Sequence, residues 1–183
     1  MIFQETPLAG LYVLQLEKLL DERGYFARAW CEKEFERKGL NPRCVQVNVG
    51  FSPKAGTLRG LHYQVAPKAE VKIVRCTRGA MFDVAVDLRP NSPTLGQWFG
   101  SELTPENGKM MYIPEGFAHG YQTLASDTEM NYQTSEFFSS ELARAIRFDD
   151  PQFGIAWPLA ITCISEKDRV CPDWVAPAVA CST

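Results

Sequence analysis

Two histidines are the first candidates for chemistry, because the chain of 183 residues contains no others. His62 stands in the run Arg59-Gly-Leu-His-Tyr-Gln64, and His119 stands in Pro114-Glu-Gly-Phe-Ala-His-Gly-Tyr121. An imidazole can take up or release a proton near neutral pH, so each histidine is a candidate acid or base. A lone histidine in a strand more often has a structural role, so the residues around each histidine must show whether it is catalytic or structural.

Three expected strands each carry polar side chains on one face: His62 and Gln64 over 58–64, Lys72 over 71–76, and Gln46 and Asn48 over 44–50. Residues two apart in a strand share a face, so these groups lie together on each strand. Such a face looks either into a barrel, where its polar groups need partners, or out to solvent. Parity alone leaves both possibilities open.

Metal binding and cysteine chemistry are weaker readings. Barrel metal sites need three or four ligands and often begin with His-x-His, whereas this chain has His62-Tyr63-Gln64, so we expect no metal. The six cysteines contain no CxxC pair and have no neighbouring histidine pattern, and we expect reduced thiols that pack as small apolar groups. They are Cys31, Cys44, Cys76, Cys163, Cys171 and Cys181.

The composition excludes several partners. Lys and Arg number 19 against 22 Asp and Glu, giving a net charge of −3, so there is no general basic field for nucleic acid. No apolar run approaches the ~20 residues of a membrane helix, and the first residues do not read as a secretion signal. We therefore expect a cytoplasmic protein with one domain over 1–183 and a loosely ordered tail from about 174.

Short strand-like runs separated by turn signals dominate the chain, and they predict an all-β antiparallel sandwich or barrel. We expect 71–76 and 81–88 to form a hairpin through a turn at 77–79. Short helices are expected at 30–38 and 140–147. The expected strands cover 10–15, 44–52, 58–64, 71–76, 81–88, 109–113 and 128–134.

An ordered set of motifs over about 5–175 resembles the dTDP-4-dehydrorhamnose 3,5-epimerase family of nucleotide-sugar epimerases. The matching runs are Asp21-Glu-Arg-Gly-Tyr-Phe26, Gln46-Val-Asn48, Leu58-Arg-Gly-Leu-His-Tyr-Gln64, Lys72-Ile-Val-Arg75, Phe82-Asp-Val-Ala-Val-Asp-Leu-Arg89, Ser92-Pro-Thr94, Ile113-Pro-Glu-Gly-Phe-Ala-His-Gly120, Tyr132, Asp149-Asp-Pro151, Trp157-Pro158 and Ser165-Glu-Lys-Asp168. The resemblance implies a cupin-type jelly roll with no metal and no cofactor. It also implies a homodimer with exchanged N-terminal strands, and a nucleoside-diphosphate 4-keto-6-deoxy sugar as substrate.

The chemistry of such a substrate asks for four kinds of group. The C4 ketone acidifies the hydrogens on C3 and C5, and removal of one gives an enolate that can be reprotonated on the other face. That needs a base near neutral pKa, a carboxylate to orient it, a positive group at the enolate oxygen and an acid on the opposite face. By matching positions, the resemblance implies His62 as base, Asp168 as its partner, Lys72 at the oxygen and Tyr132 as acid.

The resemblance assigns further residues to substrate binding. His119 matches a second active-site histidine that helps to hold the enolate oxygen. Arg59, together with Arg23 of the partner subunit, matches groups that bind the diphosphate, a role that suits the forked guanidinium. The other expected contacts with the substrate are Phe26, Arg28, Gln46, Asn48 and Phe138.

Three departures from the family pattern bear on the nucleotide. Arg28 replaces a glutamate, Phe137-Phe138 replaces a Tyr-Tyr pair, and Glu70 replaces a glutamine two residues before Lys72. Arginine offers only donors, which suit the N3 and O2 acceptors of cytosine better than the N3–H of thymine. The hypothesis is a CDP-linked 4-keto sugar, with neutral drift and an ordinary dTDP-linked substrate as the alternative.

The residues leave other possibilities open. Inversion at C3, C5 or both is compatible with the sequence, as is a role in making a deoxysugar for lipopolysaccharide O-antigen, capsule or an antibiotic. A nucleotide-sugar 3,4-ketoisomerase and a catalytically silent sugar-nucleotide binding protein are the competing functions. The joint presence of His62, Lys72, Tyr132 and Asp168 favours the epimerase over both.

Overall fold

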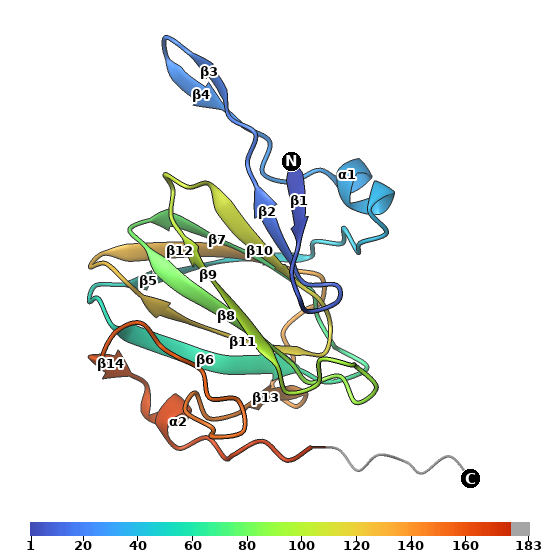
Figure 1. The fold of residues 1–183 in the computed structure, drawn as a ribbon, viewed down its shortest axis with the longest axis vertical. Helices are drawn as coiled ribbons and strands as arrows, with labels where there is room; N and C mark the ends of the chain where they lie inside the picture. The colour runs from blue at the N-terminus through green and yellow to red at the C-terminus, as the bar shows by residue number, and fades with distance from the viewer. Residues whose placement is uncertain (177–183) are drawn as a thin grey trace.

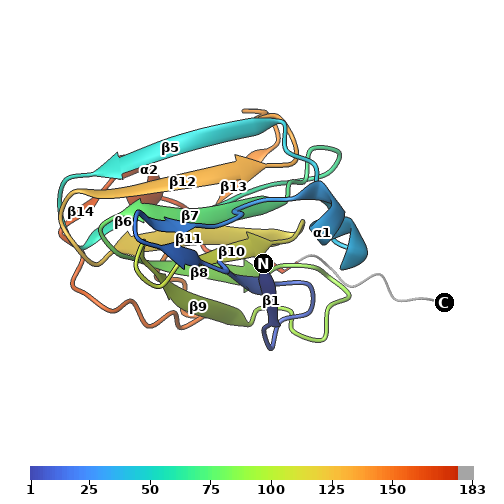
Figure 2. The same ribbon diagram turned by 90° about the horizontal axis from the view of Figure 1, so that it is seen from above.

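Two six-stranded β-sheets form most of the protein in a computed structural model that describes residues 1–176. The first sheet has the order β1-β2-β10-β7-β12-β5, with neighbouring strands antiparallel. Its strands are β1 (Ile2–Glu5), β2 (Tyr12–Gln15), β10 (Lys109–Ile113), β7 (Lys72–Arg78), β12 (Thr128–Thr134) and β5 (Gln46–Ser52). Figure 2 shows β12 and β5 side by side at one edge.

The second sheet has the order β13-β6-β11-β8-β9, and β14 adds a short parallel pairing to β6. Its strands are β13 (Ala143–Ala145), β6 (Thr57–Gln64), β11 (Phe117–Thr123), β8 (Met81–Asp87), β9 (Trp98–Leu103) and β14 (Cys163–Ile164). This arrangement confirms the expected all-β sandwich. Among the residues described there are two short helices, α1 (Glu32–Arg37) and α2 (Glu166–Arg169). The helix predicted over 30–38 is confirmed as α1, which buries Phe35.

A small hairpin of β3 (Leu19–Asp21) and β4 (Gly24–Phe26) stands apart from both sheets. Figure 1 shows it extending away from the body of the molecule. Its apolar side chains, including Leu20 at 80% and Phe26 at 69%, are exposed. A hairpin of this length has no core of its own, because two strands bury too little surface.

The predicted hairpin of 71–76 with 81–88 is wrong, because β7 and β8 belong to different sheets. The turn after β7 carries the chain across the sandwich, so the two strands face each other instead of pairing. Val74 and Cys76 from β7 and Met81 and Ala85 from β8 meet in the central core. Periodicity gives each strand's buried face but does not name its neighbour.

The helix predicted over 140–147 is also wrong. A turn at 139–142, in which Leu142 N–H donates to the Ser139 carbonyl, leads into β13. β13 pairs with the edge of β6, placing Ala143 opposite Gln64 and Ala145 opposite His62. This pairing gives hydrogen-bond partners to the backbone N–H and C=O groups on the edge of β6. Their need for partners outweighs the local preference of residues 140–147 for a helix.

Three apolar clusters hold the layers together, one between the sheets and one on each outer face. The predicted apolar face of 81–88 is confirmed, because Phe82, Val84, Val86 and Leu88 all lie in one outer cluster. Burial raises the pKa of the core thiol Cys76 to about 11, so this cysteine packs as an apolar group. No disulfide joins the five cysteines of the described residues, and Cys181 lies outside them.

Trp174, where the loose tail is expected to begin, is buried against Phe153. Its backbone N–H donates to Asp150 Oδ2 at 2.6 Å, and its carbonyl accepts from Gln152. The chain is therefore tied to the body up to this residue, and residues 177–183 lie outside the described part. Across residues 1–176, neither helix has the length and apolarity to span a bilayer.

Candidate active site

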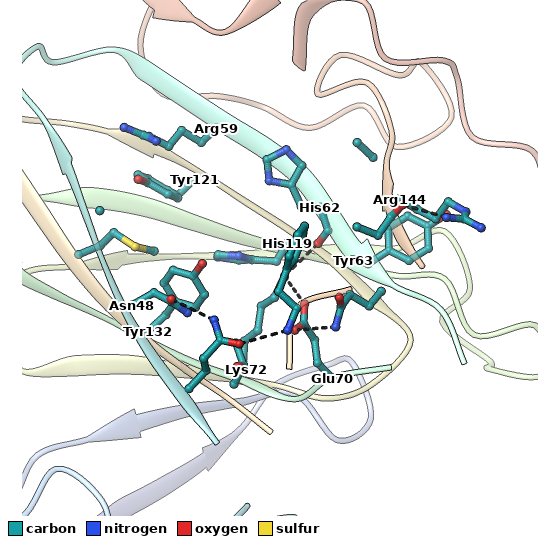
Figure 3. Close-up of a pocket in the computed structure, with 18 of the residues that line it drawn as sticks. Asn48, Arg59, His62, Tyr63, Glu70, Lys72, His119, Tyr121, Tyr132 and Arg144 are labelled. Carbon is teal, nitrogen blue, oxygen red and sulfur yellow. Dashed lines mark hydrogen bonds and ion pairs between the residues drawn. The ribbon is translucent and has the colours of Figure 1, made fainter. Parts of the chain in front are cut away.

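A cavity of about 730 Å³ opens between the two sheets, and side chains from both line it (Figure 3). The structure brings most of the predicted site residues to this cavity. Those that line it are Gln46, Asn48, Arg59, His62, Lys72, His119, Tyr132 and Phe138. Asp168 lies behind His62, whereas Arg23, Phe26 and Arg28 lie elsewhere in the same chain. The polar strand faces therefore look into the sandwich, which settles the choice that parity left open.

His62 and Asp168 form a direct contact on the wall made by the second sheet. His62 Nε2 lies 2.7 Å from Asp168 Oδ1. Asp168 is held in α2, where Ser165 caps the helix by accepting from the Asp168 N–H. Burial opposes ionisation of Asp168, but hydrogen bonds from His62 and from Gly60 N–H outweigh it and lower the pKa. The carboxylate is therefore ionised at neutral pH, and it fixes the ring of His62.

A bulge in β6 brings Arg59 and His62 to the same cavity although they are three residues apart. His119 pairs with His62 but Tyr121 pairs with Arg59, so β6 holds one extra residue against β11. Strict alternation would place Arg59 and His62 on opposite faces. Gly60 makes the bulge possible, because it adopts φ +128° and a Cβ there would lie 2.5 Å from the Cα of Gly120.

Lys72 and Tyr132 come from the first sheet and form the facing wall (Figure 3). Lys72 Nζ donates to the His62 carbonyl at 3.2 Å and pairs with Glu70 Oε1 at 3.2 Å. Burial, with a further contribution from the charge of Glu70, raises the pKa of the Tyr132 phenol. The phenol therefore keeps its proton at neutral pH and can act as a donor.

His119 lies on β11, in the same sheet as His62, next to a buried carboxylate on β8. His119 Nε2 is 2.8 Å from Asp83 Oδ1, and Asp83 is completely buried. Burial raises the pKa of Asp83, while the charge of His119 and the hydrogen bond oppose that effect. Asp83 thus orients the second histidine much as Asp168 orients the first. The cavity therefore holds two carboxylate-oriented imidazoles on one sheet.

The face of β5 carrying Gln46 and Asn48 points inward, and Val47 and Val49 are exposed on the outside. Gln46 does more than line the cavity, because its Oε1 accepts from the backbone N–H of Phe138 at 3.1 Å. Gln64 clamps the same segment: its Oε1 accepts from Ser139 N–H at 2.6 Å and its Nε2 donates to the Phe137 carbonyl at 3.3 Å.

Sequence reasoning placed neither Gln64 nor Glu70 in the site, although both line the cavity. Alternation along β6 places Gln64 on the same face as His62, and Glu70 stands where the family pattern has a glutamine. Those signals could have identified both residues. What the sequence does not show is that their side chains meet: Gln64 Nε2 donates to Glu70 Oε2 at 3.2 Å.

Arg23, Phe26 and Arg28 do not reach the cavity of their own chain. Arg23 sits in the turn of the β3–β4 hairpin, where its Nη2 lies 2.5 Å from Asp21 Oδ2. Arg28 pairs with Glu34 of α1, with Nη1 3.2 Å from Oε1. Arg23 and Phe26 belong to the β3–β4 hairpin, which projects from the body (Figure 1), and Arg28 lies between that hairpin and α1.

The arrangement suits proton transfer at a carbon next to a carbonyl. A carboxylate-oriented imidazole stands on one wall and a protonated phenol on the other, so a ring held between them meets a base and an acid on opposite faces. The Lys72 ammonium and His119 supply donors for an oxygen that gains negative charge. Within residues 1–176, no three His, Cys, Asp or Glu side chains cluster as metal ligands would.

Comparisons with known proteins identify the family that this chain resembles. The sequence model of the dTDP-4-dehydrorhamnose 3,5-epimerase family matches residues 5–175. The dTDP-4-dehydrorhamnose 3,5-epimerase of Sinorhizobium fredii is 45% identical over 173 residues, covering 94% of this chain and 89% of that protein. The crystal structure of the Elizabethkingia anophelis protein of the same description superposes with a TM-score of 0.91 at 40% identity, covering 95% and 96% of the two chains.

A third relative carries a ligand. The dTDP-6-deoxy-D-glucose-3,5-epimerase of Legionella pneumophila, solved in complex with dTDP-4-keto-L-rhamnose, superposes with a TM-score of 0.88 at 36% identity. The match covers 94% of this chain and 92% of that one. These likenesses confirm the cupin-type jelly roll predicted from the motifs.

Proposed function

Because this chain belongs to the dTDP-4-dehydrorhamnose 3,5-epimerase family and is thus an isomerase of nucleotide-linked sugars, we propose that it inverts C5, C3 or both in a nucleoside-diphosphate 4-keto-6-deoxy sugar. The reaction runs through an enolate and uses no cofactor. The observation that carries the proposal is the cavity in which the His62–Asp168 pair faces Lys72 and Tyr132 from the other sheet.

His62 is the base in this mechanism. Its Nε2 is engaged by Asp168, so Nδ1 is the ring nitrogen left to accept the substrate proton. The C–H bond breaks, its electron pair moves into the enolate and the proton stays on the imidazole. Asp168 stabilises the resulting imidazolium, as the aspartate does in other Asp–His pairs.

Tyr132 is the acid on the other face. Its raised pKa keeps the phenol protonated, so it can deliver a proton to the carbon that lost one. A new C–H bond forms on the opposite face, the centre is inverted and the ketone is restored. Lys72 and His119 donate hydrogen bonds to the C4 oxygen while it carries the enolate charge.

Two observations bear on whether the substrate carries thymine or cytosine: the names of the relatives and the contacts of Arg28. The relatives named above are described as enzymes of dTDP sugars, which favours thymine. The cytosine hypothesis stays a prediction, and part of the donor capacity of Arg28 is already engaged by Glu34. Calorimetry with dTDP and CDP side by side separates the two: binding of dTDP at least as tight as that of CDP rejects cytosine.

The proposed assembly is a cytoplasmic homodimer that exchanges N-terminal strands. The exposed apolar side chains of the β3–β4 hairpin support it, since a soluble monomer gains nothing by presenting Leu20 and Phe26 to water. The outer face of β5 adds Val49 at 64% exposure and Phe51 at 47%. Exchange would also bring Arg23 of the partner subunit to the cavity, which Arg23 of the same chain does not reach.

The central experiment is deuterium exchange. The protein is incubated in D2O with dTDP-linked and, separately, CDP-linked 4-keto-6-deoxyglucose, and the label is read by mass spectrometry and proton NMR. Exchange at C3 and C5 of the dTDP sugar identifies an ordinary 3,5-epimerase. Exchange at C5 alone, or only with the CDP sugar, identifies a changed specificity. No exchange with either contradicts the proposal and favours the ketoisomerase or the silent binding protein.

A further inference from the structure

Residues 136–139, which we call the rim segment, run past the mouth of the cavity without belonging to a strand or a helix. Phe138 lines the cavity and is nevertheless 65% exposed. Three consecutive backbone N–H groups of the segment donate to side-chain oxygens: Phe137 N–H to Glu136 Oε1 at 2.9 Å, Phe138 N–H to Gln46 Oε1 at 3.1 Å, and Ser139 N–H to Gln64 Oε1 at 2.6 Å. Side chains therefore set the path of this backbone, where a strand would use a neighbouring strand.

Gln64, the last residue of β6, holds the rim segment with both ends of its amide group. Its Oε1 accepts from Ser139 N–H, and its Nε2 donates to the Phe137 carbonyl at 3.3 Å. Nε2 also donates to the Lys68 carbonyl at 3.0 Å and to Glu70 Oε2 at 3.2 Å. The amide thus has a donor on its acceptor side and acceptors on its donor side. Because the Gln64 side chain is only 4% exposed, solvent water competes little for these bonds.

Glu136 fastens the beginning of the same segment. Its Oε1 accepts from Lys68 Nζ at 3.1 Å and its Oε2 from Arg43 Nη1 at 3.0 Å. The hydrogen bond from Phe137 N–H and these two cations lower the pKa of Glu136 to about 2, so the anchor stays ionised at neutral pH. The backbone is therefore fixed at several points while the Phe137 and Phe138 rings remain exposed, at 55% and 65%. A fixed backbone with exposed apolar rings is a surface prepared for a ligand.

Resting on the proposed function, we propose that Gln64 is a positioning residue for the nucleotide part of the substrate, holding the rim segment so that the Phe138 ring stands ready at the mouth of the cavity. The planar ring of a nucleotide base stacks on an aromatic side chain. Without the Gln64 bonds, the rim segment would have to become ordered when the substrate binds, and that ordering lowers affinity. His62 is oriented by Asp168 and not by Gln64, so the loss should appear in binding and not in proton transfer.

The test compares Gln64→Met with Gln122→Met. Methionine is unbranched like glutamine but has no amide to donate or accept. Gln122 is a matched control because it lies outside the cavity, is fully buried on β11, and holds Leu159 with both ends of its amide, at 2.8 and 2.9 Å. The substrate is 4-keto-6-deoxyglucose linked to dTDP or CDP, whichever the wild type exchanges.

For Q64M we expect KM to rise about five- to tenfold, with kcat within about twofold of the wild type, as for a loss of binding shared by ground and transition states. Q122M should have a lower unfolding midpoint than the wild type and the wild-type KM. Wild-type KM in Q64M overturns the inference, and so does an equal rise in KM in Q122M, because that would be a general effect of a lost buried amide.

A double-mutant cycle tests whether Gln64 acts through Phe138. Calorimetry with dTDP and with CDP measures the Kd of wild type, Q64M, Phe138→Ala and the double variant. We expect F138A to weaken binding and Q64M to add no further loss in the F138A background, because the ring that Gln64 positions is gone. Additive losses reject this route, as does wild-type affinity in F138A.

Gln64→Asn replaces Q64M if thermal unfolding shows that Q64M is not folded. It keeps an amide on an arm that is one methylene shorter, so it cannot reach all of the partners of Gln64, and we again expect a higher KM. Wild-type KM in Q64N then rejects the positioning role. Failure of the wild type to exchange either 4-keto sugar is a different result: it rejects the proposed function, while the calorimetric cycle still decides the role of Gln64.

Discussion

At the scale of single residues, the contact between His62 and Asp168 makes both the chemistry and the stability depend on pH. The pKa of Asp168 is lowered in the folded protein, so the contact contributes fully above the unfolded value of about 3.9. That contribution is lost as the pH falls through the lower, folded value. The pair is therefore intact throughout the neutral range in which a histidine base works.

Replacement of Asp168 by asparagine keeps the shape of the side chain and removes its charge. We expect the exchange rate at the substrate carbon to fall about a hundredfold or more, because the imidazolium loses its partner. The unfolding midpoint should also drop at pH 7, and its difference from the wild type should shrink below about pH 4. Asp173→Asn, on an exposed carboxylate five residues along, is the control. Equal exchange rates in D168N and D173N would reject the assignment.

Tyr132→Phe separates proton removal from inversion. The phenylalanine retains the packing of the ring on β12 but has no proton to deliver. We expect deuterium still to enter at the carbon that faces His62, while net inversion falls by roughly 10²–10⁴-fold. In the wild type the raised pKa of Tyr132 places the alkaline loss of inversion above about pH 10. Inversion at the wild-type rate in Y132F would show that another group is the acid.

At the scale of elements, the bulge in β6 determines which side chains reach the cavity. A methyl group at position 60 would meet the Cα of Gly120 at 2.5 Å and the His119 carbonyl at 3.0 Å. We expect Gly60→Ala to lower the free energy of unfolding by about 2–5 kcal/mol, since strain and overlap add. Activity should fall as well, because Arg59 and His62 lose their common face.

Gly39→Ala is the matched control for the bulge. Gly39 also has a positive φ, +69°, but a Cβ there meets nothing within 4 Å. We expect the free energy of unfolding of this variant to fall by only about 1–2 kcal/mol, the cost of a side chain at positive φ, and its activity to equal that of the wild type. Denaturant titration of both variants measures the difference, and equal losses would show that the approach of β6 to β11 is not tight.

At the scale of the whole molecule, the projecting hairpin predicts shared active sites. If Arg23 of the partner subunit completes each cavity, a mixture of H62A and R23A chains forms heterodimers in which one site is whole and the other lacks both groups. We expect activity to rise when the two inactive variants are mixed and allowed to exchange subunits. Absence of recovery, with heterodimers shown by mass spectrometry, would contradict strand exchange. The exposed outer face of β5 is tested separately by measuring the oligomeric state of Val49→Asp by sedimentation. If this face lies in the dimer interface, V49D should dissociate into monomers, while Val170→Asp, at an exposed position elsewhere, should stay dimeric.

Local patterns along the chain predict the class of fold, and they single out most of the side chains that line the cavity. Alternation over 44–52 and 81–88 identified the faces of β5 and β8, and the motifs around His62, His119 and Asp168 contain residues that the structure brings together at the cavity. These features are local or are carried by ordered motifs, so they can be read along the chain. Two predictions were wrong: the hairpin of 71–76 with 81–88, and the helix over 140–147. Both depend on strand pairing between segments that are far apart in the sequence, and local patterns do not encode that pairing.

Packing between the two sheets determines which of the predicted residues meet. The extra residue in β6 turned Arg59 toward His62, and the crossing from β7 to β8 set the two walls of the cavity opposite each other. The contact of Gln64, at the end of β6, with Glu70, in the segment before β7, likewise depends on how the two sheets pack. Register, bulges and sheet order are fixed by long-range hydrogen bonding and core packing, and a periodic pattern in one strand carries no information about them.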